Sequence, residues 1–217
     1  MGKPDIDTLD TIKFRMALEA DVDNLIQIHL NSFQGYLNTL LGTNYLKAMF
    51  KWFIKVDSAL LLVCYNSEQI IGYAMGAQDG YSRNMQKDLL PNIIWGMLTN
   101  PQFIIHPNVF GQFKFRLQNI LNVKSKTNDK IKLRDRIIHK DNTYALVGLA
   151  ISPEFRGSII TFKLLKEFEN HVWRRKFEAI RLTVYKFNAS VIQLYKYMKW
   201  KLYFEDKNTV RFIKTKN

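Results

Sequence analysis

The sequence predicts a single domain of the mixed α/β (α+β) class. A length of 217 residues suits one domain. A composition of 47% hydrophobic and 24% charged residues is that of an ordinary globular protein with a sizeable core. Short strand-like runs follow one another along the chain between stretches of helical spacing. We therefore expect one domain over residues 1–217.

The first part of the chain predicts a strand, two helices and a hairpin, in that order. Residues 12–16 alternate apolar and polar side chains, as a half-buried strand does. Glu19-Ala20-Asp21 opens a helical stretch, and a second stretch, from about 37 to 54, has one apolar face that should cover a sheet. Residues 60–65 and 69–77 are strand-like runs joined by three polar residues, which predicts an antiparallel pair.

Residues 79–142 change to helical spacing, broken by Pro101 and Pro107, and end in a basic polar stretch. We interpret them as an insertion of helices and loop, because the segment is short and its apolar faces need a partner. After it the chain predicts strand, helix, strand, helix, strand and strand, at 144–151, 157–176, 179–185, 188–198, 201–205 and 209–213.

The formal net charge of +13 favours a polyanionic partner. Nucleic acid, an acidic membrane surface and a phosphorylated small molecule compete as such partners, beside the alternative that the lysines are merely solvated. We expect no nucleic acid, because no basic motif with interleaved aromatic residues accompanies the charge. The apolar runs are too short to cross a bilayer and the first residues hold no signal core, which predicts a cytoplasmic protein. Cys64 lies in an apolar run and is expected to be a buried structural thiol.

The segment from Leu149 to Thr161 predicts a strand that ends in a tight turn and delivers the chain into a helix. Backbone N–H groups at such a turn point outward, and with Gly157 in the turn and a helix N-terminus behind it they form a seat for a diphosphate. Arg156 adds positive charge. The alternative is an ordinary connection in which Pro153 and Gly157 only shape the turn.

A second strand runs into a helix that we expect Asn188 to cap. Tyr195 falls two turns into this helix. A helix beside the turn after Ile151 would bring the Tyr195 phenol to the reacting end of the same ligand. The alternative is a packed aromatic side chain with a satisfied hydroxyl.

These two segments resemble the GNAT family of N-acetyltransferases. The first is similar to that family's strand, V-x-P-E-x-R-G-x-G-x-G and helix, and the second to L-x-V-x-x-x-N-x-x-A-x-x-L-Y-x-x-x-G-F. The resemblance is specific from Leu146 to Trp200 and covers most of the chain except 79–142. It implies a mixed, mostly antiparallel central sheet of about seven strands flanked by helices. The insertion resembles that of a bacterial GNAT subgroup with a long helical insert between the third and fourth strands.

The chain departs from both motifs. Ile159 and Thr161 replace the two later glycines of the first motif, and Lys199-Trp200 replaces the closing Gly-Phe of the second. Bulk at Ile159 and Thr161 would crowd a pyrophosphate near the backbone. A non-catalytic GNAT-like binding or regulatory module therefore stays open as an alternative, as does a basic membrane- or nucleic-acid-associated protein.

The resemblance implies an acyl-CoA-dependent N-acyltransferase, with acetyl-CoA or another acyl-CoA as cosubstrate and no metal. The acceptor amine would attack the thioester directly in a ternary complex, a backbone N–H near Ile151 would polarise the carbonyl, and Tyr195 would protonate the thiolate. A phenol stays protonated at neutral pH, which suits an acid. The residues implied in cofactor binding are Leu149, Ala150, Ile151, Arg156, Gly157, Ser158, Ile159, Ile160, Thr161 and Asn188.

The general base and the acceptor are not determined by the sequence. Asp79 and His29 are candidate bases because their positions can face an acceptor cleft, although a surface or packing role fits each as well. The insertion lies where it would shape acceptor choice. A small-molecule amine or a nucleotide-linked or lipid-linked sugar, peripheral membrane contact and a homodimer all stay open.

Overall fold

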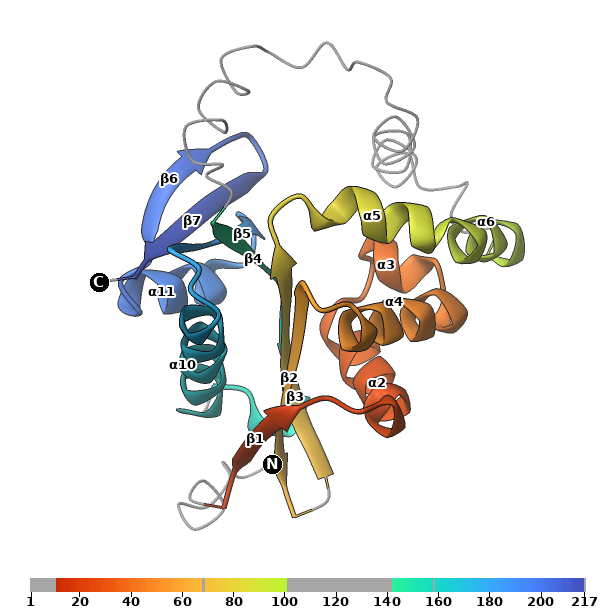
Figure 1. Cartoon of the computed structure of the whole chain (residues 1–217), viewed down its shortest axis with the longest axis horizontal. Coiled ribbons are helices and arrows are strands. Elements are labelled where there is room, and N and C mark those ends of the chain that lie inside the picture. Colours follow the sequence, from red (N-terminus) through yellow and green to blue (C-terminus); the bar gives the residue numbers. More distant parts are fainter. Residues whose placement is uncertain (1–10, 68, 101–141, 158, 217) are drawn as a thin grey trace.

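The strands of the described residues form one seven-stranded sheet in the order β1-β2-β3-β4-β5-β7-β6 (Figure 1). The computed structural model describes residues 11–67, 69–100, 142–157 and 159–216. Neighbouring strands are antiparallel except β4 and β5, which run parallel. The predicted mixed α/β class, with a mostly antiparallel sheet of seven strands, is confirmed.

The elements follow the predicted order closely. The strands are β1 (Lys13–Met16), β2 (Ala59–Asn66), β3 (Gln69–Gln78), β4 (Thr143–Ile151), β5 (Ala179–Tyr185), β6 (Lys201–Glu205) and β7 (Thr209–Thr215). The α-helices of the described residues are α2 (Val22–Ser32), α3 (Leu37–Leu40), α4 (Thr43–Lys55), α5 (Tyr81–Asp88), α6 (Leu90–Thr99), α10 (Ile159–Arg174) and α11 (Ala189–Tyr197). Short 3₁₀ turns, η1 (Glu19–Asp21) and η2 (Pro153–Phe155), precede α2 and α10.

The sheet is covered on both faces, which explains the continuous apolar run in β2. Because side chains alternate along a strand, Leu61 and Val63 enter the core beneath α2 and α4, and Leu60, Leu62 and Cys64 enter the core beneath α10 and α11. Each buried leucine contributes about 2 kcal/mol through removal of apolar surface from water. Burial also raises the pKa of the Cys64 thiol to about 12, as expected of a structural cysteine.

One predicted helix is two. Residues 37–54 do not form a continuous helix, because the helix is interrupted at Gly42 between α3 and α4. Gly42 has φ 87°, a left-handed conformation that glycine adopts at little cost and other residues avoid. The apolar spacing continued across this break, so the spacing alone did not reveal it.

Residues 79–142 begin as predicted with helices. Ile93 of α6 is buried in the core that contains α2 and α4, and Gly96 lies against the Leu41 carbonyl. Residues 101–141, with Pro101, Pro107 and the basic stretch, lie outside the described residues. That the chain is one domain with 79–142 as an insertion stays a prediction. Within the part of the chain that the structure describes, no helix is long and apolar enough to span a membrane.

Candidate functional site

A cavity of about 440 Å³ opens where β4 and β5 separate. The two strands pair only over their first residues, from Thr143 with Ala179 to Ala145 with Arg181. Beyond these pairs β4 has a bulge, because Leu146 and Gly148 face consecutive residues of β3 and Val147 has no partner there. A bulge bends a strand and increases its local twist. The bulge at Val147 therefore lies where β4 separates from β5.

The cavity passes through the level of the sheet, with helices on both sides. From α2 and the segment after it come His29, Phe33, Tyr36 and Asn38, and from α11 and its N-terminal end come Asn188, Val191 and Tyr195. The strands supply Met75, Leu146, Val147, Gly148, Leu149, Leu182, Thr183, Val184, Tyr185 and Thr209.

Residues 149–151 pair with β3 along one edge only. Leu149 lies opposite Ala74, and Ile151 lies opposite Gly72. Within the described residues no strand pairs with their other edge, which faces the divergence from β5. An extended ligand arm with amide groups can add to such an edge as another strand would.

The turn after β4 has the predicted shape. Gly157 has φ 75°, and apart from Gly157 and its chain neighbours no atom of the described residues lies within 4 Å of the position that a Cβ would take there. Helix α10 begins at Ile159, whose side chain is 52% exposed, while Ile160 is fully buried in the core. The bulk of Ile159 therefore projects to the surface at the helix N-terminus. Ser158 lies outside the described residues.

Arg156 ties this turn to α2. Its Nε donates to the Ile151 carbonyl at 3.1 Å, and one terminal NH₂ donates to the Asn31 carbonyl and the Ser32 hydroxyl, each at 3.0 Å. The guanidinium thus joins the end of β4 to the C-terminal end of the helix that carries His29. Its charge stays near the turn, as the sequence predicted, and it has a structural role that the sequence did not indicate.

Tyr195 lies in the wall of the cavity. Its side chain is 4% exposed and packs against Trp200 and Phe212, with ring centroids 5.4 and 5.9 Å away. Burial disfavours the phenolate and raises the Tyr195 pKa above its ordinary value. The hydroxyl is therefore a proton donor and not a base at neutral pH. Asn188 also lines the cavity and occupies the N-cap position of α11, but its side chain makes no cap hydrogen bond, contrary to prediction.

The two candidate bases have different surroundings. His29 is 3% exposed, lines the cavity and has its Nδ1 2.7 Å from the Tyr73 hydroxyl, while its Nε2 has no hydrogen-bond partner among the described residues. Burial lowers the His29 pKa to about 4, so the imidazole is neutral at pH 7. Asp79 instead forms a two-pronged ion pair with Arg181, at the end where β4 and β5 are still paired, and it is not among the residues that line the cavity.

Sequence reasoning missed the aromatic wall on the α2 side. Tyr36 packs edge to face on Tyr185, with ring centroids 5.5 Å apart, and both residues line the cavity. Asn38 also lines it, and its side-chain oxygen is buried without a hydrogen-bond partner in the described part of the chain. The only signal for this wall was the cluster of aromatic residues between two helical stretches, which does not reveal that the chain folds back over β5.

Residues 125–200 match the family model described as Acetyltransferase (GNAT) family. This part of the chain is therefore similar to the GNAT acetyltransferases. The matched residues include β4, the turn after it and α11, which form much of the cavity. No protein in the comparison with curated proteins matches the chain.

Solved structures share the GNAT fold over nearly the whole chain. The PaiA N-acetyltransferase from Thermoplasma acidophilum, solved in complex with coenzyme A, is 13% identical with a TM-score of 0.53, covering 94% of this chain and 99% of that one. The ribosomal-protein-S18-alanine N-acetyltransferase from Escherichia coli is 9% identical with a TM-score of 0.56, covering 94% and 93%. The ribosomal-protein-alanine N-acetyltransferase from Brucella melitensis is 15% identical with a TM-score of 0.57, covering 94% and 99%. At these identities the likeness shows the fold alone.

Proposed function

We propose that this protein transfers an acetyl or other short acyl group from acyl-CoA to an amine of a small-molecule or sugar-type acceptor. The observation that carries the proposal is the cavity at the divergence of β4 and β5. One edge of its residues 149–151 pairs with no strand that the structure describes, and its wall holds a buried tyrosine. The pantetheine arm would pair with that edge. The turn with Arg156 and Gly157, followed by the first residues of α10, would hold the diphosphate at a helix N-terminus.

The proposed reaction is direct attack in a ternary complex. The amine nitrogen forms a bond to the thioester carbonyl carbon, the C–S bond breaks, and sulfur leaves with the electron pair. The Tyr195 hydroxyl gives its proton to the thiolate. The neutral imidazole of His29 lines the same cavity and is our candidate to accept the proton that the amine releases. A backbone N–H near Ile151 stabilises charge on the carbonyl oxygen.

The first experiment is a thermal-unfolding titration of the full chain with acetyl-CoA and with longer acyl-CoA species. A ligand at 100 times its dissociation constant adds about 2.7 kcal/mol of stability. The ligand-induced gain should shrink in Arg156→Glu and persist in Lys207→Glu, which makes the same charge change in the turn between β6 and β7. Because Arg156 also ties β4 to α2, the ligand-induced gain is compared, and not the melting temperature of the free protein.

The catalytic role of Tyr195 is tested by Tyr195→Phe. Removal of the hydroxyl should lower kcat by about 100-fold, while the affinity for acetyl-CoA stays within about twofold. Tyr65→Phe, on β2 outside the cavity, is the matched control and should keep full activity.

Absence of stabilisation by any acyl-CoA in the thermal-unfolding titration would reject the proposed acyl transfer. It would favour a binding module in which Ile159 and Thr161 close the site.

A further inference from the structure

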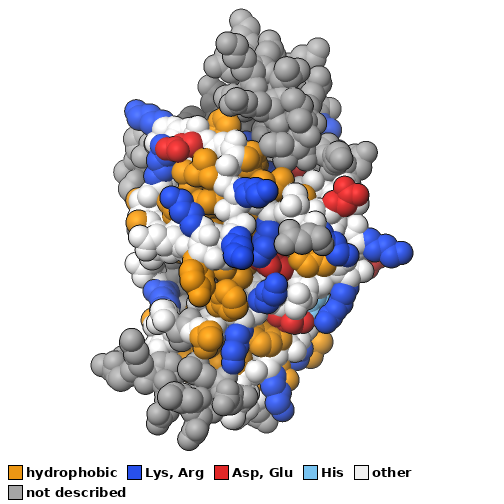
Figure 2. Space-filling model, turned by 90° about the vertical axis from the view of Figure 1, so that its left-hand side faces the viewer, with side chains coloured by type: hydrophobic (Ala, Val, Ile, Leu, Met, Phe, Trp, Pro, Cys, Tyr) orange, Lys and Arg blue, Asp and Glu red, His pale blue; other side chains and the backbone are white. Residues whose placement is uncertain are grey.

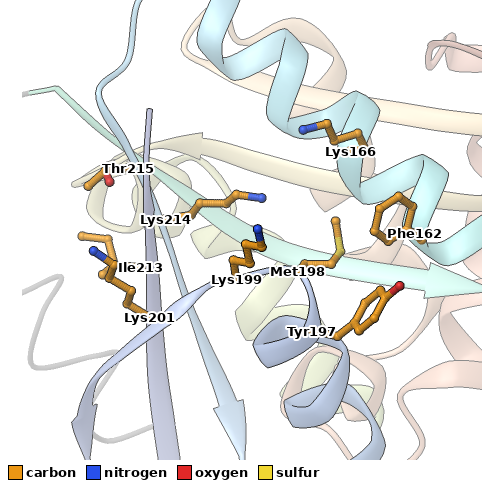
Figure 3. Close-up of a pocket in the computed structure, with 9 residues that line it drawn as sticks. All are labelled: Phe162, Lys166, Tyr197, Met198, Lys199, Lys201, Ile213, Lys214 and Thr215. Carbon is orange, nitrogen blue, oxygen red and sulfur yellow. The ribbon is translucent and has the colours of Figure 1, made fainter. Parts of the chain in front are cut away.

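A second cavity, of about 630 Å³, lies between α10, the C-terminal end of α11, the start of β6 and the end of β7 (Figure 3). Its nine lining residues are Phe162, Lys166, Tyr197, Met198, Lys199, Lys201, Ile213, Lys214 and Thr215. None of them lines the cavity between β4 and β5. Four of the nine are lysines and none is acidic, so this second cavity is a cationic site of a size that small-molecule ligands occupy.

The first chain-specific feature of this site is Lys199. It follows α11 with φ 62°, a left-handed conformation in which glycine is the preferred residue after a helix. The second GNAT motif has glycine at this position, and this chain has lysine. Its ammonium group points into the cavity (Figure 3). The chain therefore keeps a charged side chain at a position where the backbone conformation disfavours any side chain.

The second feature is Trp200, which replaces the phenylalanine of the same motif. Its indole N–H donates to Glu169 at 3.0 Å, and the fully buried Glu169 accepts two hydrogen bonds from the Lys214 ammonium at 2.8 and 2.7 Å. Trp200 thus helps to hold the carboxylate that fixes one lysine of the cavity wall. Both departures from the motif converge on the same site.

Lys199 and Lys201 differ from the other two lysines of this cavity in their charge partners among the described residues. Glu169 engages Lys214 and lies 4.0 Å from the Lys166 ammonium. No carboxylate among the described residues pairs with Lys199 or Lys201. Two ammonium groups beside a cavity without acidic residues favour an anion with more than one charge, such as a phosphate.

The other end of the cavity is aromatic. Phe162 and Tyr197 pack edge to face, with ring centroids 6.3 Å apart, and their side chains are 36% and 78% exposed. Exposed aromatic rings beside cationic groups are the surface on which a planar nucleobase stacks.

We propose that this cavity binds a nucleotide phosphate, with the base against Phe162 and Tyr197 and the phosphates against Lys199 and Lys201. Two sources supply this chemistry: a separate nucleotide, or the phosphorylated adenosine end of an acyl-CoA whose acyl arm lies in the other cavity. Binding of a separate nucleotide does not require that the protein transfers acyl groups.

The test is isothermal titration of the full chain with ADP, coenzyme A and dephospho-coenzyme A. In Lys199→Gly, binding that uses the cavity should weaken about tenfold, the effect of one lost charge-assisted hydrogen bond. Lys176→Gly is a closely matched control, because Lys176 is also exposed and left-handed, at φ 65°, but lies outside the cavity. Tyr197→Ser should weaken binding severalfold through loss of stacking.

ADP binding that depends on Lys199 and Tyr197 but not on Lys176, and that persists when the protein is saturated with coenzyme A, would identify a separate nucleotide. If coenzyme A displaces ADP, and its higher affinity relative to dephospho-coenzyme A disappears in Lys199→Gly, the site holds the adenosine end of the cofactor. Binding of all three ligands that is unchanged in Lys199→Gly and Tyr197→Ser, or binding of none, would overturn the proposal. Binding of ADP without any effect of acetyl-CoA would reject the proposed acyl transfer and leave the nucleotide site standing.

Discussion

His29 is neutral at physiological pH because its surroundings desolvate it. Its ring packs against Phe33, Phe50 and Tyr73, and its Nδ1 lies within hydrogen-bond distance of the Tyr73 hydroxyl. These neighbours offer no carboxylate that would stabilise an imidazolium, so burial dominates and the pKa falls to about 4. At neutral pH this imidazole carries no positive charge, and the lone pair of one ring nitrogen is available to accept a proton.

This depressed pKa predicts acid sensitivity. The unfolded chain binds a proton at His29 below pH 6.5, and the folded chain does not until pH falls to about 4. The free energy of unfolding should therefore decrease as pH falls from 6.5 to 4, by up to about 3 kcal/mol. Urea denaturation at several pH values measures it. His29→Gln, which cannot titrate, should flatten this slope, whereas His171→Gln on α10 should retain it. An unchanged slope in His29→Gln would contradict the assignment.

The two left-handed lysines predict an unusual gain in stability. Lys176→Gly and Lys199→Gly each remove the steric strain of a side chain on a left-handed backbone, which stabilises the folded protein. Each also gives the unfolded chain more conformational freedom, which stabilises the unfolded state. The relief of strain is the larger effect, so each variant should be more stable by up to about 1 kcal/mol in urea denaturation. Destabilisation of Lys199→Gly alone would mean that its ammonium stabilises the folded protein even without a ligand.

At this scale the sequence predicted some site residues and misplaced others. Tyr195 and His29 were both named, and they line one cavity because their helices cover opposite faces of the sheet where it opens. Asp79 was proposed as a base on the same grounds as His29. Its carboxylate instead pairs with Arg181, which lies 102 residues later in the chain. Asn38 gave no signal, because nothing in a local pattern shows which polar atom will be buried without a partner among the described residues.

At the scale of elements, strand bounds were the most predictable feature and strand divergence the least. Residues 179–185 were predicted as a strand and β5 has these bounds, because its apolar residues end at clear turn signals. The bulge at Val147 depends on how β4 pairs with β3, which lies beyond any local pattern.

Gly76 on β3 lies beside this bulge, at a position where the close packing leaves no room for a side chain. A Cβ at Gly76 would lie 2.6 Å from Phe168 Cζ and 3.0 Å from Tyr144 Cε1, and would also collide with the Ala145 carbonyl. Gly76→Ala should cost about 2 kcal/mol or more of unfolding free energy. Gly148→Ala is the comparison, because its new methyl group meets the flexible Met75 side chain and should cost less. Equal costs in urea denaturation would contradict this interpretation.

At the scale of the whole molecule, the basic side chains behind the net charge of +13 lie partly among apolar ones. Figure 2 shows lysine and arginine side chains interleaved with apolar ones on the face that carries α10, α11 and β6. The net charge by itself left three classes of polyanionic partner open. The cavity beside Lys199 favours a phosphorylated small molecule, because its lysines surround a concave site of limited size and not an extended track.

The ion pair between Glu169 and Lys214 connects this face to the rest of the fold. It joins α10 to β7, and Trp200 adds the segment after α11, so three elements depend on one carboxylate that is fully buried. Lys214→Met should cost about 3 kcal/mol in urea denaturation, because the carboxylate loses the ammonium group that donates to both of its oxygens but remains away from water.

The double variant Lys214→Met with Glu169→Gln should recover most of that loss. The amide oxygen that this second substitution introduces can still accept the Trp200 N–H, and no charge then remains buried without a partner. If the double variant were as unstable as Lys214→Met, the loss would come from packing of the lysine stem and not from the unpaired carboxylate. If it recovers, the pair stabilises the fold little by itself. Its retention would then be explained better by the cation that it fixes in the wall of the second cavity.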